Sequence, residues 1–111
     1  MQHLVELVED TYHNVAARDC HLNVGDTIKW LNPTGTEFNI HFAKGENPFL
    51  GNDFKVPAKP NGAQFGEVDS PALNPKVGDN VLHLKKFHYD LLPPAGSSFM
   101  AADPVVIVHI D

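Results

Sequence analysis

The chain has 111 residues and a formal net charge of −6, and its eight Lys and Arg residues are scattered along it. Nucleic acids and anionic membranes are bound through clustered basic residues, so neither is an expected partner. No apolar run reaches the roughly 18 residues of a membrane-spanning helix, and a chain of this length is predicted to form one domain over residues 1–111.

The ends of the chain and its cysteine content leave the compartment open. Residues 1–6 show neither the basic segment nor the apolar segment of a signal peptide. Cys20 is the single cysteine, so no intramolecular disulfide is possible, which fits a reducing compartment but is compatible with the periplasm. We therefore expect a cytoplasmic protein, or a periplasmic one whose signal peptide has been removed.

Strand signals dominate from the N-terminus onward. Ile28 and Trp30 alternate with Lys29 after a Gly-Asp turn, and Phe38, Ile40 and Phe42 share one face of a period-2 run. The segment 11–18 has the composition of at most one helical turn. Residues 43–79 are rich in Pro and Gly and predict a long central loop region with short strands inside it. The strands expected in chain order are 2–9, 20–24, 27–31, 38–42, 53–56, 64–68, 81–92 and 105–110.

About seven short strands separated by turn signals predict an all-β fold, a Greek-key β-sandwich. Four segments then resemble the cupredoxins in their order and spacing, over roughly residues 20–111. They are the Gly-Asp turn and aromatic strand of 24–32, the strand start at 37–40, the aromatic strand of 87–90 and the closing strand of 105–110. The resemblance implies a cupredoxin-like sandwich.

The same resemblance implies a degenerate copper site. Type 1 copper needs two imidazoles and a thiolate. The alignment of motifs puts Phe38 at the first His position and Asp90 at the thiolate position, and residues 91–103 contain neither His nor Cys. Met100 alone cannot hold Cu(II). We therefore expect no cofactor, and a former metal pocket filled by Phe38, by Phe87 or Tyr89, and by Pro93 and Pro94.

The seven histidines lack the close spacing of a metal motif. Cross-strand pairs remain candidates for Cu or Zn, either His83 with His109, or His13 with Cys20 and His21. Exposed, solvated histidines are the alternative, and His41 in particular should point to solvent because it alternates with buried aromatic positions. The same alternation separates Cys20 from His21, which favours a buried structural cysteine over a nucleophile.

No catalytic motif is present, so we expect a protein that is not an enzyme. The apolar loop that carries Pro93, Pro94, Phe99 and Met100 is a candidate contact surface for a protein partner. The expected function is a non-catalytic interaction or structural module, with a homodimer through an open strand edge also possible. The alternative is a metal-handling protein that binds Cu or Zn through surface histidines.

Overall fold

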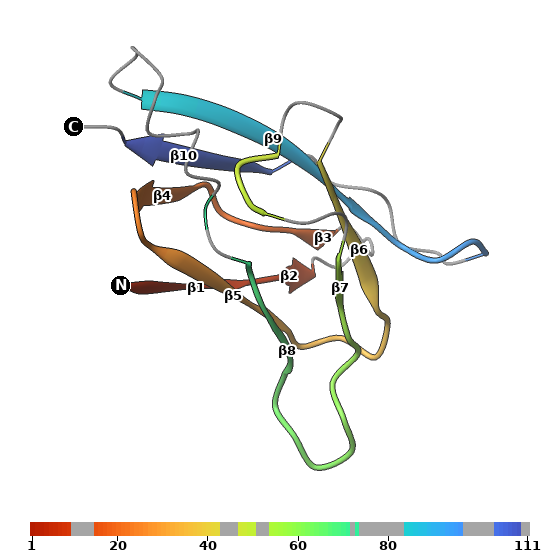
Figure 1. Ribbon diagram of the computed structural model, residues 1–111. Helices are drawn as coiled ribbons and strands as arrows, with labels where there is room; N and C mark the ends of the chain where they lie inside the picture. The colour runs from red at the N-terminus through yellow and green to blue at the C-terminus, as the bar shows by residue number, and fades with distance from the viewer. Residues whose placement is uncertain are drawn as a thin grey trace.

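The computed structural model describes residues 1–9, 15–42, 47–50, 54–71, 73, 84–96 and 104–109. Within these residues every regular element is a β-strand (Figure 1). No helix in the described part of the chain is long and apolar enough to cross a membrane. The strands are β1 (Gln2–Glu6), β2 (Val8–Glu9), β3 (Val15–Ala16), β4 (Cys20–Asn23), β5 (Thr27–Asn32), β6 (Phe38–Phe42), β7 (Phe54–Val56), β8 (Gly66–Asp69), β9 (Leu84–Leu92) and β10 (Val105–His109).

The strands form two principal sheets. One has the order β1-β5-β8, and the other has the order β4-β10-β9-β6-β7, while β2 and β3 form a small separate ribbon. β1 runs parallel to β5 and β4 runs parallel to β10, whereas the other pairs are antiparallel. The chain passes from sheet to sheet between β4 and β5, β5 and β6, β7 and β8, and β8 and β9. This is the predicted all-β Greek-key sandwich.

The sequence patterns that predicted the strands also predict their buried faces. In β5, Ile28 and Trp30 are fully buried and Lys29 between them is only half-buried. In β6, Phe38, Ile40 and Phe42 all face the core. Side chains that alternate along a strand point to opposite faces of the sheet, so these two strands bury their apolar faces against each other's sheets.

Two expectations about the N-terminal third need correction. The run 2–9 is interrupted at Leu7, which is itself buried, and continues as the short strand β2. The segment 11–18 does not supply a helical turn in its described part, because Val15–Ala16 pairs with Val8–Glu9 as a strand. Residues 11–14 lie outside the described residues. Pairing with β2 satisfies backbone groups that a single isolated helical turn would leave without partners.

Two aromatic side chains connect the sheets at the centre of the core. Trp30 of β5 packs edge-on against Tyr89 of β9, with ring centroids 5.9 Å apart. The indole Nε1–H of Trp30 donates a hydrogen bond to the Tyr89 hydroxyl at 3.1 Å. Phe42, Phe49 and Phe54 complete this aromatic cluster. The cluster therefore joins the two layers by both packing and a directional bond.

Asn32 fixes the turn that follows β5. Its side chain is fully buried, and its Nδ2 donates to the carbonyl oxygens of Thr36 and Pro57 at 2.8 and 2.9 Å. Its Oδ1 accepts from the backbone N–H of Thr34 at 3.0 Å and lies 2.8 Å from the Thr34 hydroxyl. A buried amide with these partners holds the 32–36 turn against the segment that follows β7.

Candidate functional site

The end of the sandwich around Phe38 is where the sequence predicted a former metal pocket. Phe38 begins β6 and its side chain is fully buried. Ile40 on the same strand is also fully buried and pairs with Leu91 of β9, which is fully buried as well. These side chains carry no atom that can donate an electron pair to a metal. The described side chains that β6 and β9 turn toward the interior at this end are therefore apolar.

Asp90 does not lie on the face that a ligand beside Phe38 would need. Asp90 pairs with His41, and it alternates along β9 with the buried residues Tyr89 and Leu91. Its side chain is consequently on the opposite face of the sheet from Phe38. Leu91, and not Asp90, is the β9 residue whose side chain faces the interior here. The period-2 pattern of Phe87, Tyr89 and Leu91 already contained this signal.

The proposed filling of the pocket needs a related correction. Tyr89 pairs with Phe42, four residues along β6 from Phe38, which is about 13 Å along a strand. Phe87 lies further along β9, beside Val106 of β10. Neither aromatic residue therefore fills the Phe38 end, and Leu91 takes the place the sequence analysis gave to them.

A shallow groove covers the outside of the same end. It has a volume of about 330 Å³ and lies between the start of β6, the middle of β7 and the end of β9. Lys55 Nζ lies 3.6 Å from Glu37 Oε1 at its rim. Pro93 and Pro94 of the predicted contact surface line it, whereas Phe99 and Met100 lie outside the described residues. The lining residues are Glu37, Asn39, Lys55, Leu92, Pro93 and Pro94.

Neither candidate set of metal-binding residues lies wholly within the described part of the chain. His21 is exposed on β4, where it pairs with Ile107, and His109 pairs with Asn23 at the end of β10. His13 and His83 lie outside the described residues. His41 is half-buried rather than fully exposed. No group of three or more His, Cys, Asp or Glu residues among those described is arranged to hold a metal ion.

Cys20 is buried, and its neighbour His21 is exposed on the other face of β4. Burial raises the pKa of the Cys20 thiol, and the positive charge of Arg18 opposes this only in part. A thiol that is held protonated is a poor nucleophile and a poor metal ligand at neutral pH. The predicted structural role of Cys20 is consistent with this environment.

Asp26 organises the turn between β4 and β5. Its Oδ2 accepts a hydrogen bond from the backbone N–H of Asn23 at 3.0 Å and lies 2.8 Å from His3 Nε2. The ammonium group of Met1 lies 3.2 Å from Oδ1. The hydrogen bond with His3, followed by that from Asn23, lowers the pKa of Asp26 to about 2. Gly25 supplies the positive φ of 97° that this turn requires.

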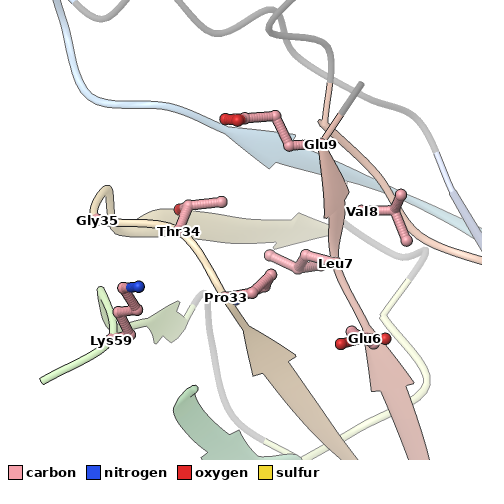
Figure 2. A pocket seen from close by; sticks show the side chains of 8 residues that line it. All are labelled: Glu6, Leu7, Val8, Glu9, Pro33, Thr34, Gly35 and Lys59. Atoms are coloured by element: carbon pink, nitrogen blue, oxygen red, sulfur yellow. The ribbon is translucent and has the colours of Figure 1, made fainter. Parts of the chain in front are cut away.

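A larger cleft lies between the β1–β2 segment and the turn after β5 (Figure 2). Its volume is about 480 Å³. Glu6 and Glu9 come from one wall and Lys59 from the opposite one, with Leu7 and Pro33 between them. The backbone N–H of Lys59 donates to the Thr34 carbonyl at 3.0 Å, which fixes the second wall. The walls of this cleft come from segments far apart in the chain, so no local pattern in the sequence predicts it.

The facing sheets, their strand order and the central aromatic pair define a cupredoxin-like β-sandwich. Solved structures of amicyanin, a cupredoxin, share this fold. Three of them are point mutants, two in an oxidized state and one in a Cu(I) form, with TM-scores of 0.50, 0.51 and 0.51. Each is 19% identical to this chain, covers 94–95% of it and is itself covered over 80–81% of its length.

Other comparisons find no match. No family model matches the chain, and no curated protein matches it. At 19% identity the likeness to amicyanin establishes the fold alone.

Proposed function

We propose that this chain is a non-catalytic cupredoxin-like domain without type 1 copper, which binds a protein partner through the Phe38 end of the sandwich. The absence of type 1 copper is argued from one observation. Ile40 pairs with Leu91 near Phe38, and all three side chains are fully buried. A blue copper site needs a thiolate and two imidazoles facing one another. Phe38 and Leu91 offer no ligand atom, and residues 91–103 contain no His or Cys.

Copper titration tests the first part. Cu(II) added to the purified protein should not produce the intense visible charge-transfer band of a blue copper site. An intense band in the unmodified protein would overturn the proposal.

The groove outside Phe38 supports the second part. It combines the apolar surfaces of Leu92, Pro93 and Pro94 with the Lys55–Glu37 ion pair. Prolines lose little conformational entropy on binding because their φ angle is already restricted. An apolar centre with a charged rim is the common arrangement of a protein-binding surface.

Site-specific cross-linking tests the second part. A photoreactive residue at exposed Pro94 should capture a specific partner, and the same residue at exposed Asn61, on the loop between β7 and β8, should not. The captured protein, once purified, should bind the chain with a dissociation constant raised about tenfold or more by Leu92→Glu and unchanged by Asn61→Glu. Equal capture at both positions, or binding indifferent to Leu92→Glu, would contradict the assignment.

A further inference from the structure

The outer face of the three-stranded sheet carries a second groove, distinct from the Phe38 end. Its volume is about 430 Å³. Leu4 and Val8 are 53% and 58% exposed, which places them among the most exposed large apolar side chains described. Leu31 of β5 and Phe65, just before β8, extend the same apolar surface. The lining is completed by two charged residues, Glu6 and Arg18.

Glu6 and Arg18 are left without opposite charges in the described part of the chain. Glu6 makes no ion pair there. Arg18 donates from Nη2 to the Leu4 carbonyl at 2.6 Å and from Nη1 to the Asp19 carbonyl at 3.4 Å, both of which are uncharged acceptors. A guanidinium has five N–H groups in a fixed plane, so donors remain for a carboxylate. An occupant of this groove should therefore bring one acid and one base together with apolar surface.

The backbone hydrogen bonds of β1, together with the Arg18–Leu4 hydrogen bond, argue against the addition of another strand at the outer edge of β1. The Thr27 N–H donates to the Met1 carbonyl, and the Leu7 N–H donates to the Leu31 carbonyl. In the segment 1–7, the N–H and C=O groups of the odd-numbered residues therefore point toward β5. The carbonyl of Leu4 then faces the outer edge of β1, where Arg18 already occupies it. Because Arg18 occupies the strand edge at Leu4, we place the association on the side chains of the outer face.

We propose that this groove binds a second copy of the chain around a two-fold axis. In a two-fold interface each surface meets itself, so Glu6 of one protomer can pair with Arg18 of its partner, and Arg18 with Glu6. Leu4, Val8 and Phe65 of both protomers then form the apolar centre. The net charge of −6 per chain opposes association at long range, and the two local ion pairs offset part of this repulsion.

Charge-reversal variants of Glu6 and Arg18 test this arrangement, with sedimentation equilibrium as the measure of dimer formation. The unmodified protein should dimerise reversibly, whereas Glu6→Arg and Arg18→Glu should each be monomeric because like charges meet twice. An equimolar mixture of the two variants should recover dimers, since each arginine of one variant would then face a glutamate of the other. Lys86→Glu, which makes the same charge change as Arg18→Glu at an exposed position on β9 of the other sheet, should leave the dimer intact.

Fluorescence of Trp30 checks that each variant is folded. If Arg18→Glu fails to fold because the Leu4 carbonyl loses its donor, Glu6→Arg and Leu4→Glu carry the test, and both must be monomeric. A monomer in the unmodified protein at millimolar concentration would overturn the proposal. So would a dimer that survives Glu6→Arg, or a mixture of the two folded charge variants that stays monomeric.

Discussion

The indole N–H of Trp30 and the hydroxyl of Tyr89 form a hydrogen bond across the core, from one sheet to the other. Trp30 is completely buried, and Tyr89 is 2% exposed, so water does not reach this bond. A buried N–H without an acceptor is costly, so the bond helps to specify how the two sheets are aligned.

We expect Tyr89→Phe to lower the free energy of unfolding by about 1–3 kcal/mol, because it leaves the Trp30 N–H buried without an acceptor. Urea unfolding followed by the fluorescence of Trp30, the single tryptophan, measures the change. Exposed Lys55→Gln is the control and should have little effect. An unchanged unfolding midpoint for Tyr89→Phe would show that the indole finds another partner.

Alkaline pH should destabilise the protein through the same tyrosine. Burial raises the pKa of Tyr89 well above its ordinary value, and the hydrogen bond with Trp30 offsets only part of that effect. The unfolded chain ionises this tyrosine above about pH 10, whereas the folded chain does not, so the stabilisation present below that pH declines above it. Unfolding measured from about pH 8 to about pH 11.5 should show a steeper decline for the unmodified protein than for Tyr89→Phe. Parallel curves would contradict the assignment.

Acid should remove a contribution from Asp26. Its pKa is lowered to about 2 in the folded protein, chiefly by His3 and then by the Asn23 backbone N–H. The carboxylate therefore stabilises the fold above its unfolded pKa of about 3.9, and this contribution is lost as the pH falls toward about 2. Asp26→Asn should be less stable than the unmodified protein by about 1–2 kcal/mol at about pH 7, and the difference should shrink in strong acid. A difference that stays constant across this pH range would exclude this role.

Gly66 should not tolerate a side chain. A Cβ atom there would overlap the carbonyl oxygen of Pro57 and lie 2.7 Å from that of Ala58, both of which are backbone atoms. Gly66→Ala should therefore destabilise the protein by about 1–3 kcal/mol or shift the 57–66 loop. Gly35→Ala is the matched control, because nothing lies within 4 Å of its added Cβ. Thermal unfolding of both variants decides the point, and equal melting temperatures would refute it.

Much of the fold follows from local patterns in the sequence. The period-2 runs around Ile28 and Trp30 and around Phe38 and Phe42 place strands and buried faces correctly, since alternation along a strand depends only on neighbouring residues. The short strands inside the Pro- and Gly-rich segment 43–79 are also confirmed, as β7 and β8. The lack of His and Cys after Asp90, up to residue 103, is likewise a property of the sequence alone.

The tertiary structure decided what no single strand can determine. The register of β9 against β6 pairs Leu91 with Ile40 and Tyr89 with Phe42, which puts Leu91, and not Tyr89, near the Phe38 end. The groove of Leu4, Glu6 and Arg18 exists only because the chain before β4 returns to the outer edge of β1. Alternation within a strand is a local property, whereas register and surface grooves depend on which distant segments pack together.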